Sequence, residues 1–290
     1  MPDMLKMLSE AQVAAYRRDG YLSPLRAMDA ADMAPLRREY AALCAREGGM
    51  LSKRTNQKPH LLLPWIDELV RHPRILDAVE DVLGPNILCW ASGFFHKPAH
   101  SPGFVSWHQD STYWGLSSPD VVTAWVAFEA STPLSGCMRV VPGTQAHDQV
   151  PHKDTFAADN LLSRGQEIQV DIDDKDAADL VLQPGEFSLH HVRIIHGSEP
   201  NNADWDRIGF TIRYVPTYVR QIGGRDSAML VRGVDEFHNF DPEPRPKADF
   251  HPDAVAFHGA MIDRVTKILF AGAPQAGQKR FGAQDQQPHG

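Results

Sequence analysis

The chain has few cysteines and no long apolar run. Its 290 residues include three cysteines, Cys44, Cys89 and Cys137, and no two of them form a Cys-x-x-Cys pair. An odd, scattered set argues against a disulfide framework and a structural zinc site, and favours buried thiols in a reducing compartment. No stretch approaches the roughly 18 apolar residues that a transmembrane helix needs. We therefore expect neither a disulfide scaffold nor a membrane span.

Basic residues are also outnumbered by acidic residues. The chain has 29 Lys and Arg against 37 Asp and Glu, which gives a net charge of -8. Since no basic block offsets this balance, we expect no nucleic acid and no anionic membrane as partner. The first residues, Met1-Pro2-Asp3-Met4, lack a basic segment followed by an apolar run, so a cytoplasmic location is expected.

Three helices are predicted ahead of residue 87. Ser9-Glu10-Ala11-Gln12 is a capping box, and Gly20 marks the end of the helix that follows it. Residues 29–46 and 73–83 each carry apolar side chains at helical spacing. These stripes are expected to pack in a core.

From residue 87 onward, short apolar runs alternate with Gly and Pro turns. The candidate strands are residues 87–95, 121–128, 138–141, 180–182, 186–195 and 208–218. Many short strands at this spacing predict a double-sheet jelly roll, which can enclose a ligand. We expect one mainly β domain over residues 1–290, with flanking helices. Its parts are a mostly helical N-terminal layer (1–86), the jelly-roll core (87–220), a C-terminal extension (221–272) and a flexible tail (273–290).

The pattern His-x-Asp occurs at residues 108–110, 152–154 and 251–253. The last pair encloses a proline, which argues against a central strand. The second follows a proline in a polar stretch and is interpreted as a loop. Only the first, His108 and Asp110, lies in a plausible strand.

Alternate residues of a strand point to the same face, so His108 and Asp110 would direct an imidazole and a carboxylate to one point. If His196 comes from a second strand, two histidines and one carboxylate lie on one side of a metal and leave other positions open. That arrangement is typical of non-haem Fe(II) oxygenases. The same three side chains could instead bind zinc with an open position for water, as in a metal-dependent hydrolase.

An ordered set of segments resembles the phytanoyl-CoA dioxygenase family, including its ectoine-hydroxylase-like members. They are Phe95-His96-Lys97-Pro98, Trp107-His108-Gln109-Asp110, Thr123-Ala124-Trp125, residues 135–144, Pro184-Gly185, His191, His196-Gly197-Ser198, Asn201 and Arg207. The resemblance covers about residues 61–218. It implies an Fe(II)- and 2-oxoglutarate-dependent dioxygenase on a double-stranded β-helix, the cupin-like jelly roll.

The resemblance also implies iron bound by His108, Asp110 and His196, with O2 as oxidant. The implied reaction is hydroxylation of an unactivated C–H bond of a small molecule, with release of succinate and CO2. Halogenating relatives carry a small residue in place of Asp110, so the carboxylate implies hydroxylation. A non-catalytic jelly roll that binds a ligand usually goes with a damaged ligand set, whereas this set is intact.

Two arginines are candidates for the distal carboxylate of 2-oxoglutarate, since a planar guanidinium meets a carboxylate bidentately. The family places its arginine about eleven residues past the second histidine, which implies Arg207. Arg213 shares its strand parity and would contact substrate or pair with an internal acid. Ser198 is implied as a further partner of the carboxylate, or is a turn residue.

Two tryptophans and a histidine match further pocket positions of the family. Trp114 corresponds to an aromatic residue of the ectoine-hydroxylase branch and Trp125 to the tryptophan of the phytanoyl branch, although both could be plain core. His191 corresponds to a histidine on the strand before the metal ligand, and its neighbour His190 could equally be the one that faces inward.

Basic residues near the expected opening of the barrel favour a small anionic substrate. In the loop at residues 52–60, Lys58 or His60 would reach the site or remain solvated. The wider set is Lys53, Arg54, Lys58, Arg193, Arg213 and Arg220. These residues could also simply balance surface carboxylates.

Overall fold

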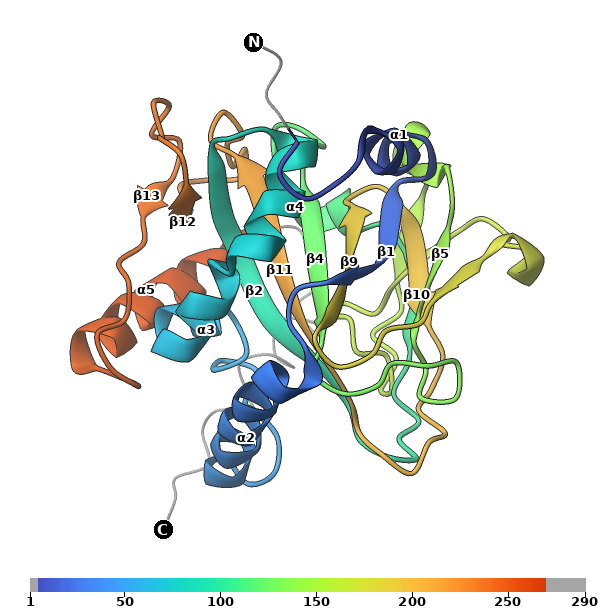
Figure 1. The fold of residues 1–290 in the computed structure, drawn as a ribbon, viewed down its shortest axis with the longest axis horizontal. Helices are drawn as coiled ribbons and strands as arrows, with labels where there is room; N and C mark the ends of the chain where they lie inside the picture. The colour runs from blue at the N-terminus through green and yellow to red at the C-terminus, as the bar shows by residue number, and fades with distance from the viewer. Residues whose placement is uncertain (1–4, 270–290) are drawn as a thin grey trace.

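Two β-sheets pack face to face, with helices on the outer side of the larger one (Figure 1). The computed structural model describes residues 5–269. The larger sheet has the strand order β1-β9-β4-β11-β2-β12-β13, and the smaller one β3-β10-β5-β8. The pairing is antiparallel except between β12 and β13. The expected jelly roll is confirmed.

The elements have the following bounds. The larger sheet contains β1 (Tyr21–Arg26), β2 (Ile87–Lys97), β4 (Val122–Ala127), β9 (Glu186–His191), β11 (Arg207–Pro216), β12 (Ser227–Arg232) and β13 (Asp241–Pro242). The smaller sheet contains β3 (Val105–His108), β5 (Met138–Val141), β8 (Ala178–Leu180) and β10 (Ile195–Ser198), and β6 (His152–Asp154) pairs with β7 (Gln166–Ile168). The helices are α1 (Glu10–Asp19), α2 (Ala30–Arg46), α3 (Pro64–Val70), α4 (Pro73–Leu83) and α5 (Pro252–Leu269).

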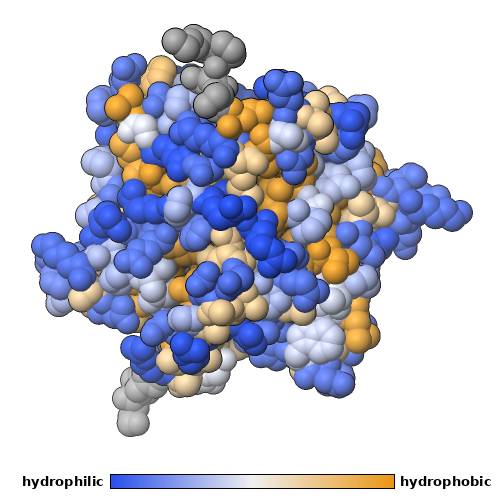
Figure 2. Space-filling view, viewed as in Figure 1, coloured by the Kyte–Doolittle hydropathy of each residue, from blue (hydrophilic) through white to orange (hydrophobic). Residues whose placement is uncertain are grey.

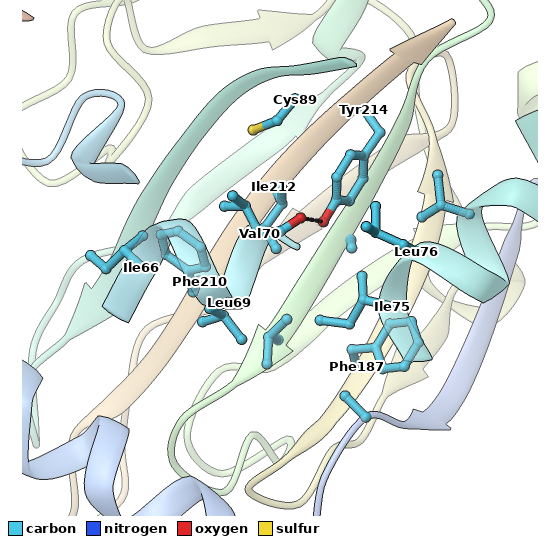
Figure 3. Close-up of a cluster of buried hydrophobic side chains, with 14 of the residues drawn as sticks. Ile66, Leu69, Val70, Ile75, Leu76, Cys89, Phe187, Phe210, Ile212 and Tyr214 are labelled. Carbon is cyan, nitrogen blue, oxygen red and sulfur yellow. Dashed lines mark hydrogen bonds between the residues drawn. The ribbon is translucent and has the colours of Figure 1, made fainter. Parts of the chain in front are cut away.

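The main core lies between helices α1–α4 and the outer face of the larger sheet. Side chains of α3 and α4 meet side chains of β2, β9 and β11 there, and the Tyr214 hydroxyl donates a hydrogen bond of 2.8 Å to the carbonyl oxygen of Val70 (Figure 3). The surface over these helices is largely hydrophilic, with apolar areas between the polar side chains (Figure 2). Within residues 5–269, no helix combines the length and apolar character that crossing a bilayer requires.

Strand β11 separates this core from the interior of the barrel. Phe210 and Ile212 belong to the core under the helices, whereas Arg207, Thr211 and Arg213 line a cavity on the opposite face. Both faces of β11 are buried, so apolar side chains that face the core alternate with polar side chains that face the cavity. The shared parity of the two arginines is thus confirmed.

The three predicted helices are present. Ser9 caps α1 in a capping box, and Gly20 follows it in the left-handed conformation at φ 82°. Asp29 caps α2 by accepting from two backbone N–H groups. Strand β1 and helices α3 and α5 were not predicted, so residues 1–86 contribute an edge strand as well as helices, and the C-terminal extension ends in a helix. The predicted flexible tail lies outside the described residues.

Two strand assignments were wrong. Residues 186–195 form β9 and the start of β10, which belong to different sheets, because the chain turns at residues 192–194. Residues 152–154, interpreted as a loop, form β6, whose register with β7 sets His152 opposite Ile168. The pair at residues 251–253 lies at the start of α5, consistent with its exclusion as a strand.

Candidate metal centre and carboxylate pocket

Three predicted ligands meet in the cavity between the sheets. Strand β3 ends at His108, and Gln109 remains extended (φ -113°, ψ 134°), so Asp110 faces the same side as His108. Strand β10 pairs with β3 and sets His196 directly opposite His108. One ligand atom from each of the three side chains lies within 4.8 Å of the others. Among the described residues, this is the one His, Cys, Asp and Glu cluster with metal-binding spacing.

The backbone holds both imidazoles in the same orientation. Nδ1 of His108 lies 2.9 Å from the carbonyl oxygen of Ser106, and Nδ1 of His196 lies 3.0 Å from that of Ile194. A carbonyl can only accept, so each Nδ1 carries the proton and each Nε2 keeps its lone pair. Nε2 is therefore the atom that each histidine offers to a metal.

The electrostatics favour the protonation states that a cation needs. Burial alone would raise the pKa of Asp110, but its neighbours His108, His196 and Arg213 together hold that pKa well below its usual range. Burial, reinforced by His108, lowers the pKa of His196 well below its usual value. A carboxylate and a neutral imidazole are thus available at neutral pH.

Gln109 fixes the backbone between His108, at the end of β3, and Asp110, which begins the following 3-10 turn. Its backbone N–H donates to Nε2 of His152 at 3.0 Å, and its side-chain amide donates to the carbonyl oxygen of Arg193 at 2.8 Å. Its amide oxygen accepts from the backbone of Val150 at 2.9 Å. His152 therefore supports the backbone between His108 and Asp110 and does not belong to the predicted ligand set.

The cavity continues from the three ligands into the barrel. Its lining residues are Phe95, Val105, His108, Asp110, Thr123, Trp125, Met138, His190, His196, Gly197, Ser198, Arg207, Thr211 and Arg213.

Arg207 is the largest fully buried polar side chain of this lining. It is 2% exposed, yet its Nε and Nη2 have no hydrogen-bond partner within the described residues. Its guanidinium lies over the ring of Trp125 at 5.3 Å. Burial lowers the pKa of Arg207 to about 10, which leaves it charged at neutral pH. Buried, charged and unpartnered donors are suited to a carboxylate.

Arg213 lines the same cavity and acts electrostatically on Asp110. It contributes to the low pKa of Asp110, and its Nε has no partner within residues 5–269. Its guanidinium lies over Trp114 at 5.0 Å. Trp114 itself is not among the residues that line the cavity, whereas Trp125 is.

Of the two neighbouring histidines on β9, one faces the cavity. His190 lines the cavity, with its ring centroid 5.1 Å from that of His196. His191 points elsewhere, and its Nδ1 accepts from the backbone N–H of Arg193 at 3.1 Å. The placement expected for His191 is therefore taken by His190, because successive side chains of a strand alternate.

Lys58 and His60 do not reach the cavity. The ammonium of Lys58 lies 2.6 Å from Glu243 in the C-terminal extension, and Nε2 of His60 lies 3.0 Å from the same carboxylate. Both side chains are buried. Lys58 and His60 are thus neither solvated nor part of the site, because a distant carboxylate binds them, whereas Lys53 and Arg54 of the same loop are exposed.

Lys97 had no predicted role, and the structure places it next to the carboxylate pocket. It pairs with Arg207 across β2 and β11, and its Nζ donates to Oγ of Ser198 at 2.7 Å. No local pattern gives the register of two strands that lie 110 residues apart. Ser198 itself lines the cavity, as expected.

The comparisons with known proteins agree with this geometry. The family model described as "Phytanoyl-CoA dioxygenase (PhyH)" matches residues 16–209, more than half of the chain. The chain belongs to the phytanoyl-CoA dioxygenase family. A solved structure of this kind, the apo form of the non-heme monooxygenase ThoJ, is 34% identical with a TM-score of 0.79, and the match covers 93% of this chain and 99% of that one.

Two further relatives extend the family match. CytC3 with Fe(II) and alpha-ketoglutarate is 26% identical with a TM-score of 0.61, covering 80% of this chain and 92% of the other. A probable alpha-ketoglutarate-dependent hypophosphite dioxygenase of Stutzerimonas stutzeri is 29% identical over 160 residues, 54% of this chain and 55% of the relative. The first three curated relatives are matched over only 51–64% of their length.

Proposed function

We propose that this protein is an Fe(II)- and 2-oxoglutarate-dependent dioxygenase that hydroxylates an unactivated C–H bond of a small molecule. One observation carries the proposal. A His108/Asp110/His196 cluster shares its cavity with a buried guanidinium whose Nε and Nη2 have no partner within the described residues. Two histidines and one carboxylate with open positions suit Fe(II). A dicarboxylate could bind the metal at one end and Arg207 at the other.

The residues present fit both groups. The lone pairs of the two Nε2 atoms and the carboxylate of Asp110 would hold the iron, and Arg207 with Ser198 would hold the distal carboxylate. When bound, iron, 2-oxoglutarate and O2 supply the oxidation: one oxygen atom enters succinate as CO2 leaves, and the other enters the substrate as hydroxyl. Trp125 packs against Arg207 and keeps water from the carboxylate, which strengthens that ion pair.

A zinc hydrolase leaves the buried Arg207 without a role, and a non-catalytic binding protein has no need of an intact ligand set. Anaerobic titration of the apo-protein with Fe(II) and then 2-oxoglutarate separates these functions. We expect a weak visible absorption band that forms only when both are present. A protein that gives no band, or turns over no 2-oxoglutarate with any substrate, contradicts the proposal.

We propose further that the substrate is a small anion that meets Arg213. Of the basic residues that favoured an anion, Arg213 lines the cavity. Lys58 is paired with Glu243, and Arg54 and Arg193 lie near Asp263 and Asp148. A relative whose name specifies hypophosphite, a small anion, supports this substrate class.

A panel of small acids, matched with neutral and cationic molecules of similar size, tests the substrate class. The measured quantity is substrate-triggered succinate release under Fe(II), 2-oxoglutarate and O2. We expect the active compounds to be anions. Activity confined to neutral or cationic compounds rejects the anion while leaving the oxygenase proposal intact.

A further inference from the structure

Lys97 is a buried basic group that has no carboxylate partner among the described residues. Its side chain is fully buried on β2, and the described residues offer it no ion pair. Its Nζ instead donates to Oγ of Ser198 at 2.7 Å and to the carbonyl oxygen of Glu199, with the carbonyl oxygens of Ser198 and Gly136 at 3.4 and 3.5 Å. All four acceptors are neutral. A buried ammonium among neutral dipoles and beside Arg207 lacks a counter-charge.

Ser198 connects this ammonium to the cavity. Its Oγ accepts the proton of Lys97, so its own hydroxyl proton remains available. Within residues 5–269 no acceptor for that proton is present, and Ser198 lines the cavity together with Arg207. A carboxylate bound by Arg207 would therefore receive a second hydrogen bond from Ser198. Donation from Lys97 fixes the direction of that hydroxyl.

We propose that Lys97 is a positioning residue for 2-oxoglutarate, which orients the Ser198 hydroxyl toward the distal carboxylate and takes up a proton from water as the carboxylate binds. This inference rests on the proposed function. Lys97 is then a second basic group of the co-substrate pocket, after Arg207, and it acts through Ser198 without contacting 2-oxoglutarate.

The surroundings of Lys97 explain the proton uptake. Burial, reinforced by the charge of Arg207, lowers the pKa of Lys97 to about 6, and the other titratable groups that act on it, Glu199 and Cys137, only partly oppose this. At neutral pH the amine is then mostly neutral in the free protein. A carboxylate next to Arg207 adds the missing negative charge and raises the pKa of Lys97. Binding and protonation are therefore coupled.

Calorimetry of 2-oxoglutarate binding to the Mn(II)-loaded protein measures the coupling directly. Titrations at pH 7.5 in two buffers of different ionisation enthalpy give the number of protons taken up. We expect about 0.5 to 1 proton per 2-oxoglutarate for the natural chain. Lys97→Met, which has a similar length and no charge, should take up none and bind about 10 to 100 times more weakly.

His190 provides the matched control, because it is another buried basic group that lines the same cavity and its pKa is lowered to about 4 by burial. His190→Gln should keep the proton uptake. Persistence of the uptake in Lys97→Met, or its loss in His190→Gln alone, would overturn the assignment to Lys97.

The pH dependence of the natural chain gives a test that needs no variant. Because binding raises the pKa of Lys97, the affinity is greatest below pH 6 and falls as pH rises toward the pKa of the bound form. The dissociation constant should rise about tenfold per pH unit in this window. A constant affinity between pH 6 and 8 rejects the inference. Failure of the natural Mn(II)-loaded protein to bind 2-oxoglutarate at all rejects the proposed function instead.

Discussion

At the scale of the residue, the two arginines of β11 line the same cavity but have different neighbours. Arg207 lies over Trp125, and its Nε and Nη2 have no partner among residues 5–269, whereas Arg213 acts electrostatically on Asp110. Strand parity alone could predict that both face inward. It could not assign their roles or find Lys97 opposite Arg207, because those depend on how β2, β4 and β11 align.

Replacement of these arginines should separate co-substrate from substrate. Arg207→Ala would remove the proposed charge-assisted hydrogen bonds to the distal carboxylate of 2-oxoglutarate. Such bonds contribute about 1.5 to 3 kcal/mol, so the KM for 2-oxoglutarate should rise about 10- to 100-fold. Arg213→Ala should leave that KM nearly unchanged and lower the turnover of the substrate. Steady-state kinetics with 2-oxoglutarate varied measures both. If the two variants exchanged phenotypes, the roles assigned to the arginines would be reversed.

Removal of one imidazole should abolish metal binding. His196→Ala deletes one of three ligands, and we expect the stoichiometry to fall from one metal per chain to none at equimolar Fe(II), measured by anaerobic equilibrium dialysis. His190→Ala is the control, because His190 lines the same cavity and its ring lies 5.1 Å from that of His196. Metal retained by His196→Ala and lost by His190→Ala would show that the ligand set is wrong.

At the scale of the element, helices with clear caps were predictable and edge elements were not. Ser9 and Gly20 mark α1 through local hydrogen bonds alone. Strand β1 contains Pro24 and lies at the edge of the larger sheet, where pairing with β9 defines it. Helix α5 did carry a signal, since its buried side chains recur at helical spacing. They are Ala254, His258, Met261 and Ile262.

A glycine on β11 makes room for the tryptophan of the pocket. A Cβ on Gly209 would lie 1.8 Å from Cζ2 of Trp125, so Gly209→Ala must displace the indole on which Arg207 lies. We expect a loss of stability of about 1 to 3 kcal/mol and weaker 2-oxoglutarate binding. Denaturant unfolding and calorimetry measure these effects.

Gly259→Ala in α5 is the control for this substitution, because its Cβ would meet only the end of the Arg54 side chain, at 3.0 Å. It should leave 2-oxoglutarate affinity unchanged. Equal effects of the two substitutions on affinity would mean that Trp125 does not support the carboxylate pocket.

At the scale of the whole molecule, a buried charge cluster joins the N-terminal layer and the C-terminal extension to the barrel. Lys58 and His60, which lie between α2 and β2, both bind Glu243, which follows β13. His60 also lies 2.7 Å from the hydroxyl of Ser92 on β2. The sequence alone could not predict this cluster, because Lys58 can be buried only when a carboxylate 185 residues away pairs with it.

Loss of that carboxylate should destabilise the whole fold. Glu243→Gln leaves the buried Lys58 with only the more distant carboxylate of Asp226, at 3.9 Å, as counter-charge, so we expect about 3 kcal/mol of lost unfolding free energy at pH 7. In the double variant with Lys58→Met the loss should be smaller than the sum of the two single losses, because the stranded charge is gone. Lys153→Gln, which removes an exposed ion pair with Glu167, is the control and should cost less than about 1 kcal/mol.

The natural chain and Glu243→Gln should differ in unfolding free energy, and the pH dependence of that difference tests whether the charge of Glu243 causes it. Burial would raise the pKa of Glu243, but Lys58 and His60 outweigh it and hold that pKa at about 2, below the value of about 4.3 for an unfolded chain. A group with a depressed folded pKa stabilises the protein fully above its unfolded pKa, and that stabilisation is lost as pH falls through the folded pKa. Urea unfolding between pH 7 and pH 2.5 should therefore show the natural chain losing its advantage over Glu243→Gln progressively below about pH 4.3. An advantage that stayed constant across this range would mean that the cluster stabilises the fold by packing and not by the charge of Glu243.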